Sequence, residues 1–280
     1  SVATRLVVAR ERDRMAHVSA HYWSIDTAFT SAGQAFGARV ASVDGHAIAT
    51  GSDFSEKGEL SAKATKAGVL HLDEATARSY ARALEDAPAS VIDSVTRKPY
   101  RRRPAAPFTT STLQQEASRK LGFTGQRTMR IAQQLYEGVD VPGAGTTGLI
   151  TYMRTDSLRI SEEARAAAEK YISGKYGKDY LPAKPRYFKT KSGAQDAHEA
   201  IRPTSVTLTP ESVKESLTAE QYKLYKLIWE RFIASLMAVC VQNTVNADIT
   251  AGDYLFKASG YSVKFDGFTV LYEEGRDDAS

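Results

Sequence analysis

The order in which sequence patterns occur restricts the fold of this chain more than any single motif. Strand and turn patterns run from about residue 21 to 95, helical patterns from 104 to about 237, and strand patterns return after residue 238. This order predicts an α+β multidomain protein. A mostly helical domain is expected to be inserted into, or flanked by, a strand-rich domain built from two separated segments.

Local signals predict the individual elements within this order. Asp44-Gly45 is typical of a hairpin turn, and acidic residues followed by a proline delimit a helix over residues 73–86. A capping box at residues 111–114 or 112–115 is expected to open the first helix of the middle region. Further helices are predicted over 126–136, from Ser161 to a stop at Gly174, and from Thr218 onward, and a last short strand is predicted over 268–272.

The strongest of these helices begins at Thr218, with Gln221 completing a capping box. An apolar stripe with helical spacing follows, which is more typical of a protein core than of a cofactor site. The stripe consists of Tyr225, Ile228, Trp229, Phe232 and Leu236.

Composition excludes several classes of protein. Of the 280 residues, 42% are hydrophobic and 25% are charged, which is ordinary for a folded domain and unlike a disordered chain. No apolar run approaches the roughly 18 residues of a membrane span. Cys240 is the only cysteine, so an internal disulfide and a cysteine-built zinc site are both excluded. These features fit a cytoplasmic location.

A formal net charge of +4 and a pI near 9.0 give the chain a mild basic bias. The cations concentrate in residues 97–103, where five of seven side chains are lysine or arginine. Such a run can bind phosphates, but it is equally typical of a solvated linker.

The most specific motif is residues 148–157, which place Tyr152 and Arg154 after the short apolar strand predicted at Leu149-Ile150. Residues two apart on an extended segment share a face, so the hydroxyl and the guanidinium would point to one spot. A phenol has a pKa near 10 and needs a nearby cation to act as a nucleophile on phosphorus. The alternative is a chance pair, because the chain contains 14 tyrosines.

A second motif, residues 196–204, brings Asp196, His198, Glu199 and Arg202 into one short segment that ends at a proline. His198 could bind a phosphate or carry a proton near neutral pH. It could equally be a structural histidine in a polar turn. The chain has no glycine-rich ATP-binding loop, no metal-ligand spacing among its other histidines and no aspartate–glutamate cluster suited to Mg²⁺.

Together these segments resemble the bacterial type IA DNA topoisomerases, close to the topoisomerase I branch. Met153 favours that branch over topoisomerase III relatives, which usually carry proline there. The segments that carry the resemblance, in the family's order, are residues 1–8, 107–117, 132–138, 148–157, 196–204 and 265–268.

The resemblance implies that Tyr152 attacks a phosphodiester in a single-stranded segment of negatively supercoiled DNA and becomes linked to the 5′ phosphate. A strand then passes through the gap and the ends rejoin without ATP. Arg154 matches an arginine that contacts the scissile region, and His198 matches a histidine that binds or stabilises that phosphate. Arg202 and Arg5 are further implied DNA contacts.

The family's domains map onto the chain as three regions. Residues 104–238 correspond to the tyrosine-bearing helical domain, and residues 17–103 with 239–280 correspond to the strand-rich hinge of the type IA arch. Residues 1–16 correspond to a fragment of the helical DNA-binding domain. The chain is expected to be an excised piece of a monomeric, nucleoid-associated bacterial enzyme with no membrane partner.

The Toprim domain, which supplies the Mg²⁺ ligands in this family, has no counterpart here. We therefore expect this chain to bind no metal and to relax DNA inefficiently when isolated. A non-catalytic DNA-binding module is the main alternative. A tyrosine recombinase or type IB enzyme fits less well, because those proteins place the arginines and histidine before the tyrosine.

Overall fold

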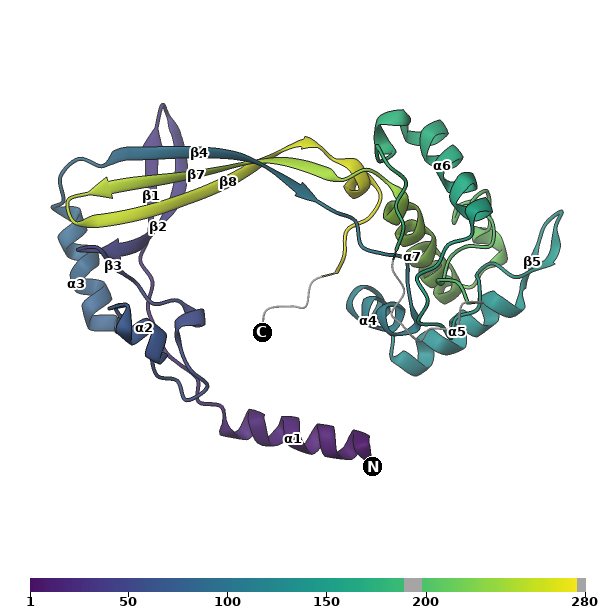
Figure 1. Cartoon of the computed structure of the whole chain (residues 1–280), viewed down its shortest axis with the longest axis horizontal. Coiled ribbons are helices and arrows are strands. Elements are labelled where there is room, and N and C mark those ends of the chain that lie inside the picture. The colour runs from purple at the N-terminus through teal and green to yellow at the C-terminus, as the bar shows by residue number, and fades with distance from the viewer. Residues whose placement is uncertain (189–197, 276–280) are drawn as a thin grey trace. The chain divides into compact units, whose positions relative to one another are not determined.

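The computed structural model (Figure 1) describes residues 1–188 and 198–275. The chain folds as two compact units, Ser1–Pro99 with Asn243–Ser262 and Tyr100–Gln242 with Val263–Ser280. Strand patterns dominate the first unit and helices dominate the second. Among the described residues, no helix is both long enough and apolar enough to span a membrane.

The strand-rich unit is built on a six-stranded sheet with the order β1-β2-β8-β7-β4, and β3 pairs with β2. β2 pairs antiparallel with β1, β3 and β8. The division between the units falls inside β4, β7 and β8. The strands are β1 (Asp26–Ser31), β2 (Gln34–Val43), β3 (His46–Ala47), β4 (Val91–Arg102), β7 (Cys240–Ala251) and β8 (Tyr254–Phe265).

Alternation and turn chemistry explain this sheet. Ala38 and Val40 on β2 are buried, whereas the intervening Arg39 is exposed and pairs with Asp26 at 2.6 Å. Asp44 and Gly45 both have positive φ, 50° and 77°, as a two-residue hairpin turn requires. The predicted hairpin at this position is confirmed.

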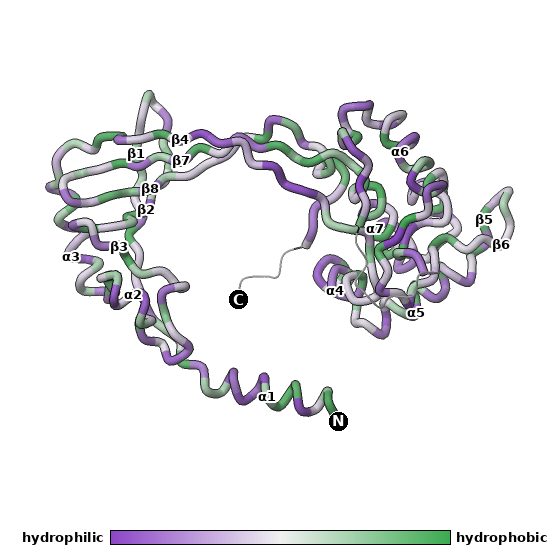
Figure 2. Tube along the Cα trace, viewed as in Figure 1, coloured by the Kyte–Doolittle hydropathy of each residue, from purple (hydrophilic) through white to green (hydrophobic). Residues whose placement is uncertain are grey.

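Three helices belong to this unit: α1 (Val2–Ala16), α2 (Ala62–Lys66) and α3 (Glu74–Glu85). Asp73 caps α3 by accepting from the backbone N–H of Thr76, which confirms the predicted helix. Hydrophobic and hydrophilic residues alternate along α1 (Figure 2), and none of its residues is buried. Arg5 is therefore exposed on α1, in the unit that does not contain Tyr152.

The helical unit is organised around α7 (Ala219–Leu236), which has eleven buried residues, including the whole predicted apolar stripe. Thr218 and Gln221 form the expected capping box. α7 packs against α4 (Thr110–Leu121), α5 (Gly125–Glu137) and α6 (Glu162–Tyr176). A hairpin of β5 (Val139–Val141) and β6 (Gly145–Thr147) follows α5 in the same unit.

Two predicted helix ends were wrong. The capping box of α4 is formed by Thr109 and Thr112, because Thr109 takes the extended conformation that a cap needs directly after the buried Phe108. α6 continues through Gly174 and ends at Gly177, whose φ of 101° a residue with a side chain rarely adopts.

The predicted strand over residues 268–272 was also wrong, since a 3-10 helix, Gly267–Val270, stands there. Gly267 has a φ of 52° and approaches the Val239 carbonyl so closely that an added Cβ would lie 2.4 Å from its oxygen. The tight turn buries Phe268 and Tyr272 in the core of the helical unit. Residues 263–275, which the resemblance placed in the strand-rich hinge, therefore pack with the helices. The functional roles of the predicted domains stay predictions.

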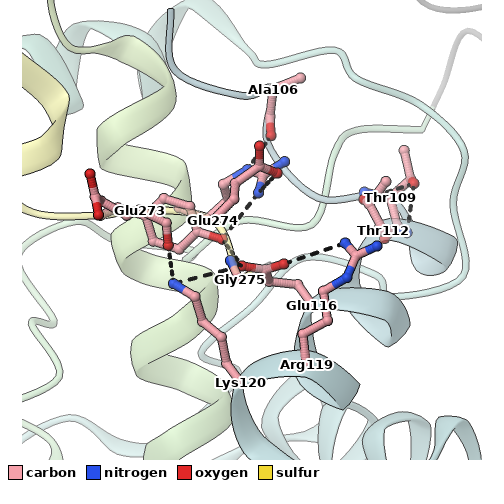
Figure 3. A network of polar contacts seen from close by, with 11 residues as sticks. Ala106, Thr109, Thr112, Glu116, Arg119, Lys120, Glu273, Glu274 and Gly275 are labelled. Carbon is pink, nitrogen blue, oxygen red and sulfur yellow. Dashed lines mark hydrogen bonds and ion pairs between the residues drawn. The ribbon is translucent and has the colours of Figure 1, made fainter. Parts of the chain in front are cut away.

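Polar contacts fasten this terminal segment to α4 and α7 (Figure 3). Glu116 on α4 is 2% exposed and accepts hydrogen bonds from the Tyr272 hydroxyl at 2.9 Å and the Gly275 N–H at 2.7 Å. Arg231 on α7 donates to the Ala106 carbonyl at 2.6 Å and to Glu274 at 2.9 Å. These contacts join three separate parts of the sequence, namely residues 106–116, α7 and residues 272–275.

Candidate active site

The two predicted motifs are held together by backbone hydrogen bonds. The Thr151 N–H donates to the Arg202 carbonyl at 2.9 Å, and the Thr204 N–H donates to the Leu149 carbonyl at 3.0 Å. Ile150 and Pro203 form a single antiparallel bridge rather than the predicted strand. Because Leu149 and Ile150 are buried, this pairing fixes where Tyr152 leaves the core.

Residues 152–157 alternate between solvent and core, as an extended segment does. Tyr152, Arg154 and Asp156 are exposed, and the intervening residues are buried. The tyrosine and the arginine thus share the exposed side of the segment, as predicted from their spacing. The guanidinium of Arg154, however, makes no ion pair or hydrogen bond with any residue that the structure describes.

The first turn of α4 holds the segment that follows Tyr152. The Thr110 N–H donates to the Thr155 carbonyl and the Thr155 N–H donates to the Thr110 hydroxyl, both at 2.9 Å. The same hydroxyl lies 2.8 Å from the Met153 carbonyl oxygen, to which it donates. The backbone on either side of Tyr152 is therefore held by residues 201–204 and by α4.

A pocket of about 250 Å³ opens at Tyr152 and is lined by side chains from α5 and both motifs. Tyr152 is 42% exposed, and its ring centroid lies 6.1 Å from that of His198 and 5.4 Å from that of Tyr136. The lining residues are Tyr136, Thr151, Tyr152, Thr155, His198 and Glu199. The structure thus brings two predicted site residues, Tyr152 and His198, into one pocket.

Arg202 faces the protein. Its guanidinium contacts the Glu199 carboxylate at 2.5 and 2.9 Å, and it also donates to the Pro203 carbonyl at 2.9 Å. Arg159 lies 3.9 Å from the same carboxylate. An ion pair this shielded, with Arg202 at 12% exposure, orients the loop beside His198. A DNA contact by Arg202 stays a prediction, and Asp196 lies outside the described residues.

Sequence reasoning missed Tyr136, Thr110 and the role of Glu199. Tyr136 and Glu199 lie inside segments that resemble the family, but nothing local indicates that α5 reaches the tyrosine. Thr110 lies just before the predicted helix start, and only the fold shows its hydroxyl bound to residues 153 and 155.

No group of three or more histidine, cysteine, aspartate or glutamate side chains that could hold a metal ion occurs among residues 1–188 and 198–275.

Gly148 permits the close approach of α5 to the tyrosine segment. An added Cβ would lie 2.7 Å from the Tyr136 carbonyl oxygen, and the next residue, Leu149, donates to the Leu135 carbonyl at 2.8 Å. We expect Gly148→Ala to lower the unfolding free energy by about 1–3 kcal/mol, because backbone must move to accept the methyl group.

Thermal unfolding would test this expectation, as a drop in Tm of about 2–4 °C per kcal/mol. Gly174→Ala is the matched control, since Gly174 lies inside α6 with nothing within 4 Å of the added Cβ. That variant should be neutral or slightly more stable. Equal Tm values for the two variants would contradict the close approach at Gly148.

The sequence and the fold of this chain both match known DNA topoisomerases. The family model for DNA topoisomerase matches residues 1–280, so the chain belongs to the bacterial type IA DNA topoisomerase family. Its α+β fold is that of the type IA enzymes.

Individual relatives agree with this assignment. The chain is 48% identical over 292 aligned residues to DNA topoisomerase 1 of Streptomyces coelicolor, covering 99% of this chain and 29% of that protein. It also resembles the solved structure of full-length topoisomerase I from Thermotoga maritima. The TM-score is 0.68 and the identity is 32%, with 97% of this chain and 41% of that one covered. The chain thus spans well under half the length of either relative.

Proposed function

We propose that this chain supplies the strand-cleaving tyrosine of an ATP-independent type IA topoisomerase that relaxes negatively supercoiled DNA. One observation carries the proposal: Tyr152 is half-exposed in a pocket beside His198, in a chain of this family. A cytoplasmic, nucleoid-associated, monomeric enzyme acting on a single-stranded DNA segment is part of the same proposal.

In the proposed reaction, the Tyr152 oxygen attacks the phosphorus of a DNA phosphodiester. A tyrosine–phosphorus bond forms and the bond to the 3′ oxygen breaks, while the phenol proton leaves and the 3′ oxygen gains a proton. One ester replaces another, so rejoining is the reverse step and needs no ATP.

Arg154 and His198 are proposed to act on the phosphate. A guanidinium can neutralise charge that develops on the phosphoryl oxygens, and an imidazole can donate a hydrogen bond to them. Arg154 lies on the exposed side of the motif, and His198 lines the Tyr152 pocket. We further propose that the Mg²⁺ of the full-length enzyme is held outside this chain, and that Arg5 contributes to DNA binding.

Covalent capture by the whole enzyme tests this proposal. Single-stranded oligonucleotides labelled at the 3′ or the 5′ end would be incubated with the enzyme and quenched with denaturant. The 3′-labelled fragment should remain on the protein, since it carries the 5′ phosphate, and mass spectrometry should place the adduct on the peptide containing Tyr152. Retention of the 5′ label, or an adduct elsewhere, would contradict it.

The 280-residue chain alone is expected to show no efficient plasmid relaxation with Mg²⁺, because it spans only 29% of the length of the Streptomyces relative. Gel electrophoresis of supercoiled plasmid, with the whole enzyme as the positive control, measures this directly. Relaxation by the isolated chain at a rate near that of the whole enzyme would show that the expectation is wrong.

A further inference from the structure

The ring of Tyr136, a residue that the sequence did not single out, lies next to the ring of Tyr152. Tyr136 lies in the last turn of α5, and its ring meets the Tyr152 ring edge to face, at 5.4 Å between centroids and 69° between planes. Aromatic pairs favour this geometry over a flat stack. Tyr136 is 41% exposed, and its hydroxyl makes no hydrogen bond with any described residue.

The backbone fixes the distance between the two rings. The hairpin of β5 and β6 projects beyond α5 (Figure 1) and returns the chain to the end of that helix. There the Leu149 N–H donates to the Leu135 carbonyl at 2.8 Å, and Gly148 packs against the Tyr136 carbonyl. Leu135 and Leu149 are fully buried, so both tyrosines project from one rigid layer of the core.

Tyr152 has few other restraints. Its hydroxyl makes no hydrogen bond with a described residue, and its only other ring contact in the described structure is the tilted one with His198, at 6.1 Å. A nucleophile needs a defined direction of attack, and small misplacements reduce rates strongly. Of the two ring contacts of Tyr152, the one with Tyr136 is the closer.

We propose that Tyr136 is a positioning residue, whose ring holds the phenol of Tyr152 in the orientation for attack on phosphorus. The inference rests on the proposed role of Tyr152. It assigns the effect to the ring and not to the hydroxyl, because the hydroxyl has no partner among the described residues whereas the ring edge touches Tyr152.

The test uses the whole enzyme with Tyr136→Ala, Tyr136→Phe and Tyr152→Phe. Single-turnover cleavage of a saturating labelled oligonucleotide gives the rate constant, and fluorescence anisotropy gives the Kd. Tyr136→Ala should slow cleavage about 10- to 100-fold with a Kd within about threefold of the parent. Tyr136→Phe should restore the rate to within about threefold, because it keeps the ring.

Tyr261→Ala is the matched control, since Tyr261 is 67% exposed on β8 and has no ring contact with a described residue. Thermal unfolding of each variant checks that the folded fraction is unchanged at the assay temperature. The control should match the parent in rate, Kd and Tm.

Several outcomes would overturn the inference. Tyr136→Ala could cleave at the parental rate, or it could lose DNA affinity with an unchanged rate constant, which would make Tyr136 a DNA contact. Loss of activity in Tyr136→Phe equal to that in Tyr136→Ala would assign the effect to the hydroxyl. Cleavage by Tyr152→Phe would instead overturn the proposed function, so the two failures are distinguishable.

Discussion

Tyr152→Phe in the whole enzyme is expected to lower formation of the covalent protein–DNA adduct at least about a thousandfold, because the substitution removes the attacking oxygen. The ring that contacts Tyr136 and His198 is kept. DNA affinity should therefore stay within about twofold of the parent. The Tm should change little, since Tyr152 is half-exposed and a hydroxyl without a described partner contributes little to stability.

Denaturing gel electrophoresis of labelled DNA after quenching measures the adduct, and anisotropy measures binding. Tyr261→Phe serves as the control for loss of an exposed hydroxyl. A variant that still forms the adduct at the parental rate would exclude Tyr152 as the nucleophile. If the parent binds DNA in a salt-dependent manner yet never forms an adduct, the non-catalytic DNA-binding module becomes the better description.

Three elements were predicted because the residues that determine them are close together in the sequence. α7 follows from its capping box and apolar spacing, and α3 follows from Asp73 as its cap. The turn at Asp44 and Gly45 follows from residues that tolerate positive φ. The strand predicted over residues 268–272 was wrong because a tertiary contact determines the structure there. Phe268 turns into the helical core because Gly267 allows a close approach to Val239.

The sequence predicted Tyr152 and His198 as residues of the candidate site, but not the other residues that line the pocket. The exposed alternation of Tyr152 and Arg154 follows from an extended backbone. The pocket, in contrast, depends on pairing of residues 149–151 with 201–204 and on the approach of α5, which no local pattern encodes. Tyr136 therefore looked like an ordinary helix residue until the fold placed its ring beside Tyr152.

The buried cluster around Glu116 gives the second large expected effect (Figure 3). Lys120 and Arg119 lie 3.6 and 3.8 Å from its carboxylate, and the Tyr272 hydroxyl and Gly275 N–H donate to it. Burial raises the pKa of the Tyr272 phenol, so the hydroxyl keeps the proton that it donates. Removing the carboxylate would leave buried donors without an acceptor, which costs roughly 1–3 kcal/mol for each group.

Glu116→Ala is therefore expected to lower the unfolding free energy of the helical unit by about 3 kcal/mol. Denaturant unfolding followed by tryptophan fluorescence suits this test, because Trp229 is buried in that unit whereas Trp23 is exposed. Glu116→Gln should lose less, since its amide oxygen still accepts a hydrogen bond. Glu163→Ala, at an exposed position in the first turn of α6, should change stability by less than about 1 kcal/mol. Equal losses for Glu116→Ala and Glu163→Ala would mean that the cluster does not hold residues 272–275 against α4.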